Sequence, residues 1–570
     1  MSGKRQGGRN DPTGGLILGL KSAAVAGSTP ARAPQNKFRH GYRYGGAIVA
    51  VIAILPAAAA AQSVSSDRIE AIEQQIRKMQ AELKDLKGEL GKAKEQLRQS
   101  RSEAQRSKEQ ALEAQQAAQQ AQQNAASAAN SQYQATQAAA KAQAVAAAPP
   151  AATATIGGVN ITMPGGRPTI STSDGRASFA IGTQVQFDMG GYFQNPGPNT
   201  QFPNLNNGVN LRRARIFFVG KFDDFTLNLT PDFGGSPDGS PTLYEANLNW
   251  SGYKPVTATV GYFKPWFSLY DSQSSNDFLQ MERPSIIEIA RNLAAGDARA
   301  SVGGAAAWDQ LFLSGYLTGA AYGANSGNNL GGEQLGFVGR LAGRPYYDKD
   351  WNLYVGMSGE DVFHPNIVNN TIPSETISLS DRPELRIDNN RLINTNAVPA
   401  SGANSFGGGV GVSWRNLIVQ GEYYRINVDQ TQPCCKASPV LDFNGGYVEG
   451  GWVITGEPIR YSVGSAAFAR PKVADPFSWG GGIGAWEISA RYSATNLNSN
   501  ITPGVAQSVT GGVNGGFQQV AGVLVSWYPN DWVRLYLQGQ YTNVDKLNTG
   551  STTQIGQHFY TLEGRWQVAF

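Results

Sequence analysis

The chain ends in the stretch HFYTLEGRWQVAF, residues 558–570, in which large apolar side chains alternate with polar ones. Strict alternation is typical of a β-strand, because successive side chains of a strand point to opposite faces. The stretch therefore predicts a strand with one apolar face and one polar face. The apolar face carries Tyr560, Leu562, Trp566, Val568 and Phe570, and the polar face carries Thr561, Glu563, Arg565 and Gln567.

The same alternation recurs in short segments back along the chain, and no window beyond Arg167 shows a long helical period. Residues 179–189 are one clear example. Elsewhere the apolar face is predicted to carry Ala214, Ile216, Phe218, Phe225, Leu227, Leu229, Tyr244, Ala246, Leu248, Trp250, Trp486, Ile488, Tyr492, Val533, Leu535 and Leu537, and the polar face Arg213, Arg215, Glu245, Asn247, Glu487, Arg491 and Arg534.

Strands of this kind occur both in soluble sandwiches and in membrane barrels. Aromatic residues such as Trp250, Trp527 and Trp532 gather at the strand ends, as they do at membrane interfaces. Backbone groups that face lipid must all be paired, and strands achieve this only in a closed barrel. We therefore predict an all-β transmembrane barrel over residues 167–570. At roughly 25 residues per strand with its share of turns, this length corresponds to about 16 antiparallel strands.

The connections between these strands are predicted to differ at the two ends of the barrel. Residues 528–531 read YPND, which is typical of a tight turn. The longer stretches 363–407 and 496–516 are rich in Gly, Asn and Ser and are predicted to be loops on the opposite, extracellular side.

The sequence before residue 167 predicts a secretory signal peptide, a coiled coil and a linker. The leader, residues 1–61, is basic and ends in an apolar run followed by Ala59 and Ala61, which is typical of a secretory signal with an extended basic region. Residues 62–137 are predicted to form an α-helical coiled coil with its core at 67–125, because apolar residues follow an unbroken heptad from Ile69. The Ala-, Pro- and Gly-rich residues 138–166 are predicted to be a linker.

Charge and cysteine content exclude several classes of protein. The chain has a formal charge of +4, but its leader carries eight Lys and Arg residues and one Asp, which leaves about −3 for the rest. A nucleic-acid partner is therefore not expected. The two cysteines, Cys434 and Cys435, are adjacent in sequence, so they cannot form a disulfide bond that links distant elements. The three histidines lie far apart in the sequence. We expect no metal site and no cofactor.

Six segments beyond residue 165 form a recognisable set when they are taken in order. They are LRRARIFFVGKF with LTPDFGG, VGYFKPWFSLYDSQSSNDFLQMER, GGYVEGGWVITGEPIRY, SAAFARPK, GAWEISARYSATNLN and VSWYPNDWVRLYLQGQYTNVD. Together they resemble the phosphate-selective porin O and P family over residues 165–570. The resemblance implies a trimeric barrel of sixteen strands, whose third loop folds inward as a constriction.

The segment expected to fold inward, residues 271–299, is not basic. It carries five carboxylates and three arginines, a net charge of −2, and residues 165–570 carry 27 Lys and Arg against 32 Asp and Glu. A phosphate filter needs a concentrated positive field, so the family's substrate is not carried over to this chain. The candidate constriction residues in this segment are Asp271, Asp277, Glu282, Arg283, Glu288, Arg291 and Arg299.

Arginines on the polar faces of the strands are further pore-lining candidates. They could form a basic wall, or they could pair with carboxylates on neighbouring strands and stabilise the barrel. The assignment depends on strand register, since a slip of one residue reverses it. The candidates are Arg213, Arg215, Arg491, Arg534 and Arg565, with Glu245, Glu487 and Glu563 as their expected partners.

These observations predict a Gram-negative outer-membrane porin for passive diffusion of small hydrophilic solutes and ions. The alternatives are an anion-selective channel and a tether that joins the outer membrane to the cell wall through the coiled coil in the periplasm. No catalytic residue is expected, because neither histidine of the mature chain lies in a recognisable motif. The expected partners are membrane lipid, two further copies of the chain and the outer-membrane assembly machinery, which would read the terminal Phe570.

Overall fold

The computed structural model describes residues 154–156, 158–194, 204–235, 241–323, 333–365, 375–431 and 440–570, together with seven helical residues between 78 and 99. The chain divides into two compact units, Met1–Gln132 and Tyr133–Phe570. The leader 1–61, nearly all of the predicted coiled coil, and Cys434 and Cys435 lie outside the described residues. The coiled coil therefore stays a prediction.

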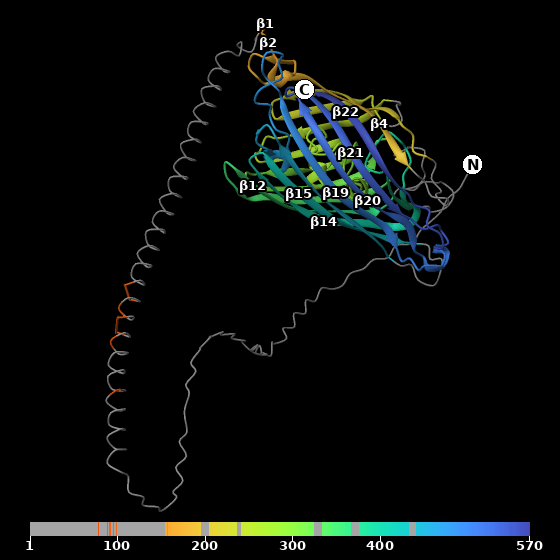
Figure 1. Ribbon diagram of the computed structural model, residues 1–570. Coiled ribbons are helices and arrows are strands. Elements are labelled where there is room, and N and C mark those ends of the chain that lie inside the picture. The colour runs from red at the N-terminus through yellow and green to blue at the C-terminus, as the bar shows by residue number, and fades with distance from the viewer. Residues whose placement is uncertain are drawn as a thin grey trace, which may run out of the picture. The chain divides into compact units, whose positions relative to one another are not determined.

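The second unit is a closed antiparallel β-barrel, because its last strand, β22, pairs with β4 at the start of the ring. Figure 1 shows the tilted strands of the wall, with β22 beside β4. Within the described ranges the ring has 16 strands, in agreement with the prediction. They are β4 (Ala177–Gln194), β5 (Gly208–Phe222), β6 (Phe225–Asp232), β7 (Thr242–Trp250), β8 (Val256–Phe263), β9 (Arg299–Ala307), β10 (Leu311–Ala321), β11 (Leu335–Tyr347), β12 (Trp351–His364), β14 (Ile393–Trp414), β15 (Leu417–Gln430), β16 (Leu441–Val453), β19 (Ala485–Ser499), β20 (Val513–Tyr528), β21 (Val533–Asp545) and β22 (His558–Ala569).

Smaller elements accompany the ring. No helix among the described residues is long and apolar enough to span a bilayer. The smaller elements outside the ring are the strands β1 (Ala154–Ile156), β2 (Val159–Thr162), β3 (Thr169–Thr172), β13 (Thr376–Asp381), β17 (Arg460–Ser462) and β18 (Ala467–Ala469), the helices α2 (Leu269–Ser272), α3 (Ser285–Arg291) and α4 (Gln507–Thr510), and the 3-10 turns η1 (Pro164–Gly166) and η2 (Val463–Ser465).

The outer face of the ring is apolar and has an aromatic girdle. Along β19 every second side chain is exposed, so Trp486, Ile488 and Tyr492 face outward while Glu487 and Arg491 are buried inside. Tryptophans of neighbouring strands stand beside one another near one end of the barrel, for example Trp351 beside Trp414 and Trp486 beside Trp527. Tyr423, Tyr492, Tyr541 and Tyr560 are exposed further along their strands. An apolar outer band with aromatic borders is what a bilayer requires.

Two β-bulges change the predicted faces. Gln186 pairs with Arg213 and Phe187 with Leu211, so Arg212 is an extra residue in β5. In β7, Thr230 pairs with Glu245 and Pro231 with Leu243, so Tyr244 is extra. A bulge lets two consecutive side chains point to the same side. The prediction that Tyr244 faces outward is therefore wrong: its ring lies 3.5 Å from the Arg215 guanidinium, inside the barrel.

Two predicted connections also differ from the structure. The predicted loop 363–407 contains β13 and residues 393–407 of β14, because a stretch rich in small residues can form a strand as well as a loop. The predicted linker 138–166 contains β1 and β2, which pair as a hairpin through Gly158 at φ +81°. The tight turn after Tyr528 is confirmed, since β21 begins at Val533.

Candidate functional site

The connection between β8 and β9 folds into the barrel interior, the lumen, as the resemblance implied. We refer to residues 264–298 as the inward loop. It reaches the far wall, where the backbone N–H groups of Leu269 and Tyr270 donate to the Glu422 carboxylate of β15 at 2.8 and 3.0 Å. Ser489 of β19 donates to the Leu279 carbonyl at 2.6 Å. The inward loop is therefore fixed across the lumen by side chains of strands more than 100 residues away.

Two further segments enter the lumen. Residues 382–392, the second inward segment, follow β13, and Glu384 accepts from Arg491 of β19 at 2.6 Å. Residues 454–484, the turn-side insertion, join β16 to β19, and Arg340 of β11 donates to the Ala466 carbonyl at 2.7 Å. The insertion also meets the inward loop, because Arg470 lies 3.5 Å from Asp277.

Glycines on the inner face of the wall make room for these segments. A Cβ atom at Gly451 would lie 2.8 Å from a methyl group of Leu279, and one at Gly411 would lie 2.6 Å from the Phe468 ring. Both distances are shorter than a side chain tolerates. Glycine at these positions therefore permits the close packing of the inward loop and the turn-side insertion against the wall.

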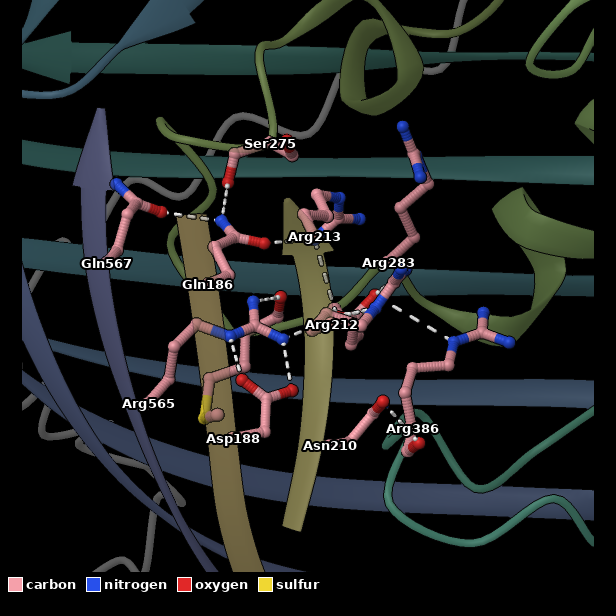
Figure 2. Close-up of polar contacts among 12 residues, drawn as sticks. Gln186, Asp188, Asn210, Arg212, Arg213, Ser275, Arg283, Arg386, Arg565 and Gln567 are labelled. Atoms are coloured by element: carbon pink, nitrogen blue, oxygen red, sulfur yellow. Dashed lines mark hydrogen bonds and ion pairs between the residues drawn. The ribbon is translucent and has the colours of Figure 1, made fainter. Parts of the chain in front are cut away.

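The densest cluster of charges surrounds Glu282 of the inward loop. Its carboxylate lies 2.8 Å from Arg212, 2.6 Å from Arg565, 3.7 Å from Arg213 and 3.8 Å from Arg386. Figure 2 shows the guanidinium of Arg565, from β22, facing the Asp188 carboxylate of β4. That pair is joined by two hydrogen bonds of 2.6 and 2.7 Å.

The remaining carboxylates of the inward loop are paired as well. Asp271 lies 2.7 Å from Arg291 and 3.1 Å from Arg283, and Arg291 also reaches Asp297 at 2.7 Å. Glu288 has Arg283 at 3.5 Å, Arg291 at 3.7 Å and Arg386 at 3.5 Å. Within the inward loop, every carboxylate thus has a basic side chain within 4 Å.

Arginine neighbours keep two of these acids, Glu282 and Glu288, ionised. Burial acts to raise the pKa of Glu282, but Arg212, Arg213 and Arg565 hold that pKa well below its usual range. Burial acts in the same way on Glu288, and Arg291, Arg386 and Arg283 lower its pKa to about 2. Both carboxylates therefore carry a full charge at neutral pH.

The structure places the predicted wall arginines on the inner face, but only Arg534 has one of the expected partners. Arg534 does pair with Glu487, at 3.0 Å. Arg215 pairs with Asp232 at 2.7 Å and not with Glu245, which accepts from Thr230 at 3.0 Å. Arg565 and Arg491 pair with carboxylates outside the predicted set, and Arg299 donates to the Ala295 carbonyl at 2.6 Å. The Glu563 side chain is 1% exposed and lies against the Asp188 carboxylate, not in an ion pair with a predicted arginine.

Sequence reasoning missed several residues of this site. Arg212 is brought inside by the bulge, which alternation cannot reveal. Asp188 lies on the polar face of 179–189 and could have been named from that pattern. Glu384 and Arg386 lie in a stretch predicted to be an extracellular loop, and no local signal shows that it enters the barrel.

Open space remains along one side of the lumen. A cavity of about 450 Å³ lies against β6, β7 and β8, lined by Asn228, Glu245 and Asn247 among others. A second cavity of about 530 Å³ lies nearer the C-terminus, lined by Arg167, Arg470 and Lys472 among others. Both are lined by Ser274 of the inward loop. The wall from β15 to β22 is instead covered by the inward loop, so Arg534 and Glu487 do not border open space.

The barrel region is similar in sequence to a known family and to two known proteins. The family model of the phosphate-selective porin O and P family matches residues 179–570. Porin O of Pseudomonas aeruginosa is 25% identical over 428 residues, which cover 72% of this chain and 93% of that protein. An uncharacterized protein of Caulobacter vibrioides is 28% identical over 157 residues, 27% of this chain and 28% of that one.

Solved structures with a similar fold have low sequence identity. An anion-selective porin from Comamonas acidovorans is 10% identical, with a TM-score of 0.42 over 69% of this chain and all of that one. OmpT of Vibrio cholerae is also 10% identical, with a TM-score of 0.40 over 69% of this chain and 98% of that one.

Proposed function

Because the chain belongs to the phosphate-selective porin O and P family and is an outer-membrane porin, we propose that its lumen conducts small hydrophilic solutes and ions with only weak charge selectivity. The pairing of every inward-loop carboxylate with a basic side chain within 4 Å carries this proposal. Paired fixed charges cancel at a distance, so the constriction has a transverse field and little net potential.

The proposed passage runs along β6 to β10, where the inward loop leaves the wall uncovered. Its candidate lining residues from the sequence are Glu245 and Asp277, which border the 450 Å³ cavity. The other candidates hold the inward segments or the wall and act on ions through their field. They are the buried Arg213, Arg215, Glu282, Arg283, Arg291, Arg299, Arg491, Arg534 and Arg565 and the half-buried Glu288.

An anion-selective channel is the alternative. Four arginines surround Glu282, and their charge exceeds that of Glu282 and Asp188 together. A positive excess of this kind would attract anions if it reached the open passage. Three of the four side chains, however, are no more than 6% exposed, and Arg212 is 17% exposed.

The reversal potential in a salt gradient tests the selectivity. For the full-length protein in a planar bilayer with a KCl gradient, we expect a K⁺ to Cl⁻ permeability ratio within about threefold of one. A ratio far below one would establish the anion-selective alternative. Absence of any conductance from correctly folded protein would contradict the porin proposal itself.

The assembly of the barrel is proposed to depend on its last residue. The backbone N–H groups of Phe570 and Thr183 each donate to the carbonyl of the other at 3.1 Å, which extends the seam between β22 and β4. A terminal aromatic residue on such a strand fits recognition by the outer-membrane assembly machinery.

Deletion of Phe570 is therefore expected to lower the amount of folded protein in the outer membrane to a small fraction of the wild-type amount. The reason is that the strand loses both its terminal aromatic residue and two seam hydrogen bonds. Heat-modifiable mobility in membrane fractions measures the folded amount. Phe570→Tyr, which keeps a terminal aromatic residue, should stay close to wild type, and equal loss in both variants would contradict the assignment.

The oligomeric state and the N-terminal unit complete the proposal. A homotrimer is supported by the family resemblance and by isoleucines at core positions of the predicted coiled coil. We propose that the coiled coil lies in the periplasm, where it would tether the barrel to the cell wall. Deleting residues 67–125 separates the two roles, since loss of envelope cohesion with unchanged conductance would support the tether.

A further inference from the structure

The 450 Å³ cavity is bordered by an ordered ladder of amide side chains. Asn228 of β6 and Asn249 of β7 donate to the side-chain oxygen of Asn247 at 3.0 and 2.8 Å. Asn247 donates in turn to Glu245 at 3.2 Å, and Thr259 of β8 donates to Asn249 at 2.7 Å. Each amide nitrogen has two N–H groups, and the ladder uses one of them. The wall therefore presents both donors and acceptors, held in fixed positions by one another.

Aromatic rings border the same cavity. Phe263 and Tyr316 line it, and their rings meet edge to face with centroids 5.5 Å apart. Trp266 of the inward loop and Phe468 of the turn-side insertion line it as well, and Trp266 packs edge to face against Phe312. The cavity thus combines a hydrogen-bonding wall with apolar ring surfaces that are fixed by their own packing.

The charges that border the cavity do not favour an anion. Glu245 and Asp277 are its two acids. Lys264 is its one basic residue among the described lining, and its ammonium group donates to the Asp271 carbonyl and lies 3.9 Å from the Asp271 carboxylate. The Lys264 ammonium group therefore already has partners within the inward loop. A phosphate group in the cavity would lie beside the carboxylates of Glu245 and Asp277.

We infer that this cavity is a binding subsite for neutral, hydroxyl-rich solutes of the saccharide class. A sugar hydroxyl both donates and accepts, which matches the amide ladder, and the C–H faces of a sugar ring pack on aromatic rings. The volume lies in the range of ordinary small-ligand sites. This inference rests on the proposed function, because the solute reaches the cavity only through an open lumen.

The test is the reduction of ion current by maltose. With full-length wild-type protein in a planar bilayer, current in KCl should fall saturably with maltose, and more than with a polyethylene glycol of the same hydrodynamic size. The paired variant Asn228→Ala/Asn249→Ala should weaken apparent maltose affinity about tenfold, since two hydrogen-bonding amides are lost. The current of each variant without sugar is the reference for its own fractional block.

Asn427→Ala is the matched control. Asn427 of β15 donates to Asn404 at 3.2 Å, the same kind of cross-strand amide pair, but on the outer face of the barrel. The Asn427→Ala variant should bind maltose with the affinity of the wild-type protein. Trp266→Ala tests the aromatic contribution and should also weaken maltose binding.

The failure of this inference is distinguishable from the failure of the porin proposal. Conductance with no more block by maltose than by the size-matched polymer would overturn the saccharide subsite and leave the channel intact. Equal affinity in wild type and in the paired variant would also overturn it. Absence of conductance in folded wild-type protein would instead remove the proposed function.

Discussion

Replacing Glu282 with glutamine is expected to shift the ion preference of the channel toward Cl⁻ by roughly tenfold in permeability ratio, because four arginines lose the carboxylate between them. Glutamine keeps the shape and one acceptor oxygen. The change therefore removes a charge from the constriction with the least change in volume. Reversal potentials in a KCl gradient measure the shift.

Stability is expected to fall in the same variant. Glu282 is 1% exposed, and loss of one partner of a buried ion pair typically costs about 3–5 kcal/mol. The inward loop should loosen with the loss, since Arg565 and Arg212 hold it to the wall through this carboxylate. The temperature at which the barrel loses its heat-modifiable mobility measures the effect.

Asp223→Asn provides the control for Glu282→Gln. Asp223 pairs with Arg176 at 2.8 Å, but both side chains are more than half exposed and lie at one end of the barrel. An exposed ion pair of this kind contributes little to stability, because water and salt screen it. This variant should keep wild-type selectivity and stability. An equal change of permeability ratio in the two variants would show that the Glu282 cluster does not act on the passage.

Replacing Gly451 with leucine is expected to narrow the channel. The new side chain would occupy the space of Leu279, whose methyl group lies 2.8 Å from the Cβ position, so the inward loop must move away from β16. Overpacking of this kind costs about 1–3 kcal/mol, which a flexible segment relieves by displacement more readily than a closed wall does. Because β16 lies across the ring from β6 to β8, the displaced loop moves toward the proposed passage, and we expect single-channel conductance to fall by about twofold or more.

Gly539→Leu is the matched control for Gly451→Leu. Gly539 lies on the outer face of β21, and a Cβ atom there would meet nothing within 4 Å. Its conductance should match wild type. If Gly451→Leu folds with unchanged conductance, the inward loop does not limit the current, and the constriction must lie elsewhere.

The fold could be predicted from the sequence because its main signal is local. The alternation in 558–570 is read within one strand, and the structure has β22 there with Glu563 and Arg565 inside and Trp566 outside. The closed ring then follows from the lipid environment, because strands in a bilayer can pair all of their backbone N–H and C=O groups only in a closed barrel. The predicted inward segment also corresponds to most of the inward loop.

The partners of the site residues could not be predicted in this way. Alternation assigned Arg213 and Arg215 correctly to the inner face, but it gave the wrong side for Tyr244, because a bulge adds one residue that no local pattern marks. The expected partner of Arg491 was a carboxylate on a neighbouring strand. Its closest partner is Glu384, 107 residues earlier in the chain, on a segment that reads as an ordinary loop.

The sequence by itself therefore determined the strands, their apolar exterior and the closed barrel, because these depend on side-chain period and on the cost of unpaired backbone in lipid. Only the tertiary structure decided which charges meet at Glu282, which stretch of wall the inward loop leaves open, and where amides and aromatic rings gather around one cavity. These features depend on contacts between segments that closure of the ring brings together. Such contacts are set by register and by the space that glycines leave, and neither is visible within a single strand.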